Sequence, residues 1–581
     1  MDGAANTTTA TAVTRPVVLY PTPGMGHLFA MIELGRALAS RGVAVTVVVV
    51  DPPYDTGAPA PFLAGVSTAN PSISFHRLPT PDLPPVASKH YEALIMEAVR
   101  VSNPHLRTLL LAAAAAPTAI VLDMFSGAAL DVATELGVPA YFFFTSGAAS
   151  LAFHLHLPAL HARTSASFRD MGGDGELLHV PGIPPIPATH AFHAVMDRDD
   201  VAYDGFLYAS TALCRCEGVI VNTFSWLEPR AVEAIAAGLC TPPGEPTPPV
   251  HRVGPLIKSS EFVAEGSNAA ACLPWLDKQP EGSVVFLCFG SLGRFSAEQT
   301  RELAKGLEAS GQRFLWVVRA PPPSDDDDTE KRVRRSPELD MDALLPDEFR
   351  HRTKGRGLVV PSCAPQRDVL AHASVGGFVT HCGWNSVLEA VVAGVPMLGL
   401  PVHAEQRMNL VVLEKELGLA VALEGYDKDR GVVAAEEVAA KVRWLMDSGG
   451  GGSVLRERVA LAMVKAKEAL RQGGESDAAL AGLVDLVLRL GLSFNTFAGM
   501  ERQHPLFDSW SVPSLPCRAS ASPAADDMTN SASEDMALPI GHHTERVLHP
   551  VVTVIAVNNK LALAEGEELL FHSEQNGFHR G

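Results

Sequence analysis

The feature of this sequence that most limits its possible folds is an alternation of short apolar runs with helix-length amphipathic segments. In the first part of the chain the helical pattern covers 28–41, and the apolar runs are Pro16–Tyr20, Val43–Val50, Ala119–Asp123 and Ala140–Phe144. Strands that are apolar throughout and separated by helices are typical of a parallel sheet covered on both faces. The pattern therefore predicts an α/β fold.

The same alternation begins again after a proline-rich stretch. Its apolar runs are Ser283–Phe289, Phe314–Arg319, Leu358–Pro361, Gly377–Thr380 and Val395–Leu400. Proline and glycine interrupt the pattern at 181–187 and at 241–249, and we place a domain boundary in the second of these stretches. The sequence thus predicts two doubly wound, Rossmann-like domains, over residues 16–248 and 249–474.

Three helical patterns follow the last apolar run, at 434–446, 455–471 and 476–490. The helix over 475–490 is expected to pack back on the N-terminal domain. Residues 1–15 and the tail 491–581 are expected to be disordered, apart from one strand-like run at 551–557. A stretch of prolines and charged residues predicts a solvated loop over 320–345.

Composition excludes several classes of partner. With 46 basic and 65 acidic residues, the net charge of −19 disfavours binding to nucleic acid or to an anionic membrane. Residues 1–15 lack the segments of a secretory signal, and no apolar stretch reaches the roughly 18–20 residues that span a bilayer. The eight cysteines are scattered without metal-ligand spacing, as in a reducing compartment. We therefore expect a cytoplasmic protein with no metal site and no integral membrane segment.

Two polar residues stand where the first sheet is expected to bind ligands, at the carboxyl ends of its strands. His27 lies in the loop that leads from the first strand into a helix, and Asp123 ends another strand. An imidazole held by a carboxylate can remove a proton from a hydroxyl at neutral pH. On its own, the loop is equally compatible with a His27 that merely caps the helix.

The same loop also offers a different interpretation. Gly24 and Gly26 come close to a dinucleotide-binding fingerprint, and Asp51 ends the second strand, where a ribose-binding acid would stand. Phe29 replaces the third glycine of that fingerprint. A nicotinamide-dependent oxidoreductase is therefore disfavoured.

A denser cluster of polar residues runs from Cys363 to Gln406. Here a strand that ends at Thr380 enters a glycine-containing turn, and a helix begins near Asn385. Backbone N–H groups and the helix dipole then point at one place, which suits a phosphate group. His381 and Ser386 add donors there, and Glu389, one turn further on, can accept hydrogen bonds from ribose hydroxyls.

The segment from Cys363 to Gln406 resembles the signature box of plant family 1 UDP-dependent glycosyltransferases. Further matches are Asn222-Thr-Phe224, Gly254-Pro-Leu256 and Phe289-Gly-Ser291, so that the resemblance covers about Pro16 to Leu490. It implies a GT-B fold, in which an acceptor-binding N-terminal domain and a UDP-sugar-binding C-terminal domain face a central cleft. The implied reaction is an inverting transfer of glucose from UDP-glucose to a phenolic, flavonoid-like hydroxyl, giving a β-O-glucoside without metal or other cofactor, in a monomer.

The resemblance also implies roles for individual residues. His27 would be the general base and Asp123 its partner. Gln366 would meet the uracil and Glu389 the ribose. The complete set of implied donor-binding residues is Ser291, Cys363, Ala364, Gln366, His381, Trp384, Asn385, Ser386, Glu389, Glu405, Gln406 and Thr145. In the family, tryptophan at the position of Trp384 and glutamine at that of Gln406 go mostly with glucose.

This chain departs from the family pattern at two places. Cys363 stands where the family has a tryptophan that stacks on uracil, and base–aromatic stacking is worth about 1–3 kcal/mol. Leu400 and His403 stand where relatives usually carry aromatic residues. A catalytically impaired homologue that binds a UDP-sugar or a phenolic compound is therefore the alternative function. His154, His156 and His161, near the predicted acceptor loop, are interpreted as pocket-lining or surface residues.

Overall fold

The computed structural model describes residues 15–51, 59–113, 116–171, 176–259, 268–322, 339–427, 431–447, 449–501, 555–557 and 560–562. The chain divides into two compact units, Met1–Phe507 and Asp508–Gly581. Of the second unit the structure describes one antiparallel pair, β16 (Ile555–Val557) with β17 (Lys560–Ala562). The predictions of disorder for 1–14 and for the rest of the tail beyond Glu501 lie outside the described residues.

The first half of the larger unit is built on a parallel sheet of seven strands, in the order β3-β2-β1-β4-β5-β8-β9. The strands are β1 (Val17–Tyr20), β2 (Val45–Val50), β3 (Ile73–Leu78), β4 (Ala119–Asp123), β5 (Ala140–Phe144), β8 (Gly218–Val221) and β9 (Val250–Arg252). The chain winds outward in both directions from β1 and β4. The carboxyl ends of these two strands therefore flank the crevice where such sheets bind ligands.

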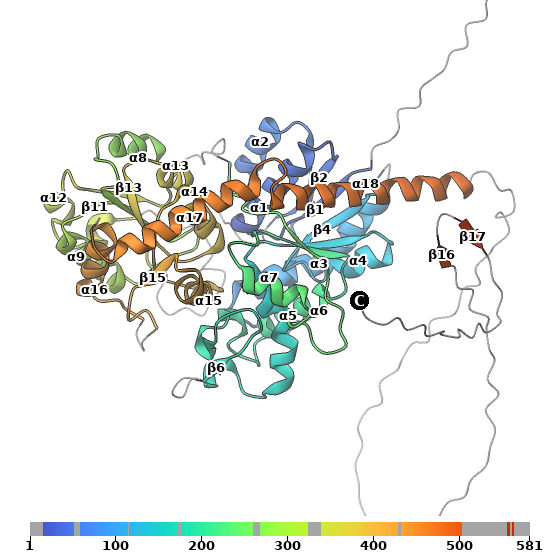
Figure 1. Ribbon diagram of the computed structural model, residues 1–581, viewed down its shortest axis with the longest axis horizontal. Helices are drawn as coiled ribbons and strands as arrows, with labels where there is room; N and C mark the ends of the chain where they lie inside the picture. Colours follow the sequence, from blue (N-terminus) through green and yellow to red (C-terminus); the bar gives the residue numbers. More distant parts are fainter. Residues whose placement is uncertain are drawn as a thin grey trace, which may run out of the picture. The chain divides into compact units, whose positions relative to one another are not determined.

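Helices cover both faces of this sheet because their apolar stripes need a partner (Figure 1). They are α1 (Met25–Ala39), α2 (Pro59–Ala69), α3 (Tyr91–Ala112), α4 (Ala129–Glu135), α5 (Ala148–Arg163), α6 (Val201–Leu213) and α7 (Pro229–Ala236). Between α5 and α6 lie the short turns η1 (Phe168–Met171), η2 (Ala188–His190) and η3 (His193–Val195), and the pair β6 (Leu177–Leu178) and β7 (Ile186–Pro187).

The second half repeats the architecture with six parallel strands, in the order β12-β11-β10-β13-β14-β15. They are β10 (Val284–Cys288), β11 (Arg313–Val318), β12 (Gly357–Pro361), β13 (Val375–Thr380), β14 (Met397–Gly399) and β15 (Ala420–Ala422). Its helices are α8 (Ala269–Leu276), α9 (Ala297–Ser310), α11 (Met341–Leu344), α12 (Phe349–Arg352), α13 (Gln366–Leu370), α14 (Trp384–Ala393), α15 (Gln406–Val412), the π-helical turn η4 (Leu413–Leu417), α16 (Ala435–Met446), α17 (Gly452–Leu470) and α18 (Glu475–Glu501).

These two sheets confirm the predicted α/β class with two Rossmann-like halves. Several details differ from the sequence-based expectation, and strands β8 and β15 were not among the predicted apolar runs. Strand β9 still pairs with β8, so the first sheet extends a few residues past the boundary placed at 248, because the proline-rich stretch 241–249 connects two strands of one sheet. Edge strand β3 was not predicted, since its mixed burial lacks a continuous apolar run. Within the predicted loop 320–345, α11 forms where the Asp340 carboxylate accepts hydrogen bonds from two backbone N–H groups.

Helix α18 returns to the first half after α17 (Figure 1). Four of its apolar side chains are buried in the same cluster as residues of β1, β2 and α1; they are Leu480, Leu483, Val484 and Val487. Arg41 pairs with Asp477 at 2.5 Å, and Ser476 donates a hydrogen bond to the carbonyl of Gly254. The helix continues beyond Leu490, where its apolar pattern ends in the sequence, to Glu501.

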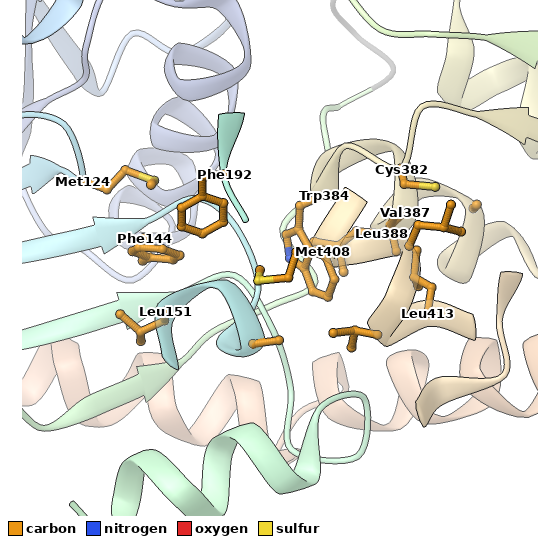
Figure 2. Close-up of a cluster of buried hydrophobic side chains, with 14 of the residues drawn as sticks. Met124, Phe144, Leu151, Phe192, Cys382, Trp384, Val387, Leu388, Met408 and Leu413 are labelled. Atoms are coloured by element: carbon orange, nitrogen blue, oxygen red, sulfur yellow. The ribbon is translucent and has the colours of Figure 1, made fainter. Parts of the chain in front are cut away.

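The buried apolar core is continuous between the two halves. In Figure 2, Trp384 and Met408 of the second half lie between two groups of buried side chains. One group belongs to the first half and includes Phe144 and Phe192, and the other belongs to the second half and includes Leu388. The indole N–H of Trp384 donates to the carbonyl of Asn222 at 2.8 Å. This contact ties the N-terminal end of α14 to the end of β8.

Candidate active site

A pocket opens where the carboxyl ends of the first sheet meet the second half. Its lining comes from both halves and consists of Gly26, His27, Tyr91, Glu92, Met124, Phe125, Thr145, Ser146, Ser150, His154, Phe192, Ala194, Phe206, Trp384, Asn385, Ala404 and Glu405. The lining combines aromatic and thioether side chains with several titratable groups.

His27 and Asp123 form a hydrogen-bonded pair at the edge of this pocket. His27 lies in the first turn of α1 and Asp123 is the last residue of β4, and the His27 Nδ1 to Asp123 Oδ2 distance is 2.8 Å. The carboxylate is fully buried, whereas the imidazole is 21% exposed. Asp123 Oδ1 accepts further bonds from Thr22 Oγ1 at 2.9 Å and from the N–H of Phe125 at 3.1 Å.

These bonds decide which nitrogen of His27 meets a ligand. An ionised carboxylate only accepts, so Nδ1 carries the proton and Nε2 keeps a free lone pair. Burial lowers the pKa of His27, but the charge and hydrogen bond of Asp123, aided by Glu405 and Glu92, outweigh it, so that the pKa is raised above 6.5. The pair can therefore accept a proton at Nε2 and stabilise the resulting imidazolium.

Glu92 is a buried carboxyl group in the pocket that the sequence did not single out. Burial raises its pKa to about 7, and the negative charge of Glu405 acts in the same direction. A signal was present in the sequence: Glu92 occupies the same helical stripe as the buried Ile95 and Val99 of α3. A carboxyl group on an apolar stripe is rare outside functional sites.

Replacing Glu92 with glutamine is expected to move the acid limb of the kcat/KM profile to lower pH. The reason is that the Glu92 carboxylate helps to raise the pKa of His27, and activity needs the neutral imidazole. Glu97→Gln is the matched control, because Glu97 lies on the same helix but pairs with Arg100 outside the pocket. A rate profile measured from pH 5 to 9 that is identical for the Glu92 variant and the wild type would contradict this coupling.

Four predicted donor-site residues lie near the junction of the halves. Thr145 Oγ1 is 3.3 Å from His27 Nδ1. Glu405 Oε1 accepts a hydrogen bond from Ser146 Oγ at 3.1 Å, which joins the two halves across the pocket. Gln406 is buried, and its side-chain oxygen accepts hydrogen bonds from two backbone N–H groups at 2.9 and 3.0 Å. Trp384 uses its indole N–H on Asn222 and presents only its ring to the pocket.

Three more predicted residues form a connected cluster beside α14. Gln366 Nε2 lies 2.9 Å from Ser386 Oγ and 2.8 Å from Glu389 Oε2. Burial raises the pKa of Glu389, although the bond from Gln366 and the charge of Lys258 oppose the shift. A carboxylate held in this way can accept hydrogen bonds from a vicinal diol.

The N-terminus of α14 is positioned as the sequence predicted, directly after the turn that follows β13. Asn385 Nδ2 donates to the carbonyl of Gly26 at 3.2 Å, and His381 is buried beside the turn. Burial lowers the pKa of His381 to about 3, so this imidazole is neutral and has one N–H that can donate a hydrogen bond. Ser291 lies exposed in the loop after β10. The helix terminus and these donors suit a phosphate group.

Cys363 and Ala364 lie in the loop between β12 and α13, and both are half-buried. The backbone there is fixed independently of the thiol, because Asn268 Nδ2 donates to the carbonyls of Pro361 and Cys363, each at 2.7 Å. A different side chain at 363 would therefore start from the same backbone position.

Three of the earlier expectations concern features other than this pocket. Asp51, the acid of the dinucleotide interpretation, accepts two hydrogen bonds from Arg77, at 2.6 and 2.7 Å. Among the residues that the structure describes, no cluster of three or more His, Cys, Asp or Glu side chains is placed to hold a metal ion. No helix within the described ranges is long and apolar enough to cross a membrane.

Two doubly wound halves bring an imidazole–carboxylate pair and a helix terminus suited to phosphate to one pocket. This is the arrangement that the resemblance to nucleotide-sugar-dependent glycosyltransferases of the GT-B class implies. A family model described as "UDP-glucoronosyl and UDP-glucosyl transferase" matches residues 260–435. A phloretin 2'-O-glucosyltransferase of Malus domestica is 43% identical over 485 residues, which cover 81% of this chain and 99% of that protein. The chain thus belongs to the UDP-glycosyltransferase family and is a hexosyltransferase-type enzyme.

Other similar proteins agree with this assignment. An anthocyanidin 5,3-O-glucosyltransferase of a Rosa hybrid cultivar is 43% identical over 81% of this chain and 98% of its own length. The solved structure of Phytolacca americana UGT2 complexed with UDP-2fluoro-glucose and pterostilbene is 39% identical, with a TM-score of 0.71, over 81% of this chain and 99% of that one. The GT-B fold is therefore confirmed, and nothing in these comparisons supports a protein that only binds its ligand.

Proposed function

We propose that this enzyme transfers glucose from UDP-glucose to a hydroxyl of a small phenolic, flavonoid-like acceptor and inverts the anomeric carbon, without a metal ion. The observation that carries the proposal is the 2.8 Å His27–Asp123 pair inside a pocket lined by both halves. The named relatives, which act on phloretin and anthocyanidins, support the choice of acceptor class.

In the proposed mechanism the first half, 16–248, binds the acceptor and places its hydroxyl at His27 Nε2. The acceptor oxygen attacks the anomeric carbon as its proton passes to Nε2. The bond from that carbon to the diphosphate breaks on the opposite face, and UDP leaves with the bonding electron pair. Asp123 stabilises the imidazolium, and the product of this inversion is a β-glucoside.

The second half, 249–474, is proposed to hold the donor. Gln366 meets the uracil and Glu389 the ribose hydroxyls. The N-terminus of α14, with His381, Asn385, Ser386 and Ser291, meets the diphosphate. The residues proposed to contact the sugar hydroxyls are Trp384, Glu405, Gln406 and Thr145. Cys363 and Ala364 are proposed to contact the uracil. Fixed N–H dipoles and neutral donors aimed at the leaving diphosphate supply the charge stabilisation that a metal would otherwise give.

We also propose a cytoplasmic monomer. None of the seven cysteines that the structure describes forms a disulfide, and five of them are buried, as suits a reducing compartment. The larger unit closes its own pocket from two halves of one chain, so that a second copy is not needed to complete the site.

The test of this function is transfer of labelled glucose from UDP-glucose to a panel of flavonoids and simple phenols in the presence of a metal chelator. We expect turnover on the order of 1 s⁻¹ or faster with at least one phenol, and a product whose anomeric proton shows the β configuration by NMR. Measurable UDP binding without transfer to any acceptor would instead favour the binding-protein function. A requirement for added divalent metal would contradict the proposed charge stabilisation.

A further inference from the structure

Helix α5 places two polar side chains in the pocket wall that the proposed reaction does not use. Ser150 and His154 are one turn apart on the same face of the helix, and both are buried and line the pocket. Within the part of the chain that the structure describes, neither Ser150 Oγ nor His154 Nε2 has a hydrogen-bond partner. Buried polar atoms in proteins are nearly always paired, so these two atoms point to a ligand.

The hydrogen bonds of His154 define what this ligand offers. His154 Nδ1 lies 2.9 Å from the carbonyl oxygen of Ser150, and because a carbonyl only accepts, Nδ1 carries the proton. Burial lowers the pKa of His154 to about 4, so the ring is neutral near pH 7. Its Nε2 is therefore a hydrogen-bond acceptor, whereas the Ser150 hydroxyl can donate. A ligand hydroxyl is the simplest group that satisfies both.

A row of aromatic rings connects this position to the proposed base. The ring centroids of His27 and Phe125 are 5.1 Å apart, those of Phe125 and Phe206 are 5.4 Å apart, and those of Phe206 and His154 are 5.6 Å apart. All four residues line the pocket. A planar aromatic acceptor packed along this row would have one end at His27 and the other at His154.

We propose that Ser150 and His154 form a second hydroxyl subsite, which selects polyhydroxylated phenolic acceptors and fixes the hydroxyl that reaches His27. The proposal rests on the proposed function. A distal hydroxyl of the acceptor donates its hydrogen bond to His154 Nε2, and the same oxygen accepts one from Ser150 Oγ. The subsite thereby sets the orientation of the acceptor and the position that receives glucose.

The test compares an acceptor that carries the distal hydroxyl with the same compound lacking it. For the wild type we expect kcat/KM to favour the hydroxylated acceptor about three- to tenfold, the value of one neutral hydrogen bond. His154→Phe keeps a ring of similar shape but removes the acceptor nitrogen, and it should bring this ratio to about one. Ser150→Ala should lower the ratio as well. His156→Phe is the matched control, because His156 lies on the same helix, bonds a carbonyl through Nδ1, and does not line the pocket.

Two results would overturn the proposal. One is an unchanged ratio in His154→Phe, and the other is an equal loss with both acceptors, which is what a purely structural role predicts. With a multiply hydroxylated acceptor, His154→Phe should also spread glucose over more positions. If the wild type transfers glucose to no phenol, the proposed function fails, but the subsite can still be tested by calorimetric binding of the same acceptor pair to the UDP-loaded protein. Tighter binding of the hydroxylated compound to the wild type, but not to His154→Phe, supports the subsite. Equal binding of the two compounds to the wild type contradicts it.

Discussion

Replacing His27 with alanine is expected to lower kcat for glucose transfer by about 10²- to 10⁴-fold, the usual contribution of a general base. The expectation follows from geometry: Nδ1 is held by Asp123 at 2.8 Å, so Nε2 is the free basic nitrogen at the pocket edge. The measurement is kcat at saturating UDP-glucose and acceptor. Binding of UDP, which we propose to lie in the other half, should be nearly unchanged.

Asp123→Asn provides a second measurement of the same pair. The shape is kept, but an amide that donates to Nδ1 would favour the wrong tautomer, and we expect a loss of similar size, about 10²- to 10⁴-fold. Thr145→Val is the milder comparison, since Thr145 Oγ1 lies at 3.3 Å from Nδ1 and does not hold the ring alone. If His27→Ala keeps more than about a tenth of the wild-type kcat, the base lies elsewhere, and Glu92 is the next titratable group in the pocket.

Replacing Cys363 with tryptophan is expected to tighten UDP binding by about 5- to 150-fold, because a ring on the uracil adds about 1–3 kcal/mol of stacking. The backbone at this position is held by Asn268 through main-chain carbonyls, so the new ring starts from an unchanged main chain. Calorimetric dissociation constants for UDP and UDP-glucose give the measurement.

Cys363→Ala is the control for this substitution, and it should leave the dissociation constant close to that of the wild type, because a thiol contributes little stacking. An unchanged affinity in Cys363→Trp would mean that the base does not lie over residue 363. A drop in kcat with tighter UDP binding would indicate that product release has become slower, which a burst of product in the first turnover would reveal.

Much of the fold follows from local sequence patterns. The strands Ala119–Asp123 and Ala140–Phe144 have the predicted bounds, because continuous apolar runs between helices have few alternatives to a buried parallel strand. Edge strand β3 and short β9 were missed because they are only partly buried, so their residues carry no continuous apolar signal. The extension of α18 to Glu501 was missed for a related reason: its apolar period ends before the helix does.

The sequence by itself determined the two series of strands, the contiguous segment from Cys363 to Gln406, and the polar residues His27 and Asp123 at strand ends. Each depends on neighbours along the chain, or on the rule that parallel strands end at one edge. Only the tertiary structure decided that Glu92 and His154 enter the same pocket as His27, that Ser146 reaches Glu405, and that the Trp384 indole bonds Asn222. These contacts join residues far apart in sequence, and their geometry is set by how the sheets and helices of the two halves pack, which no local pattern encodes.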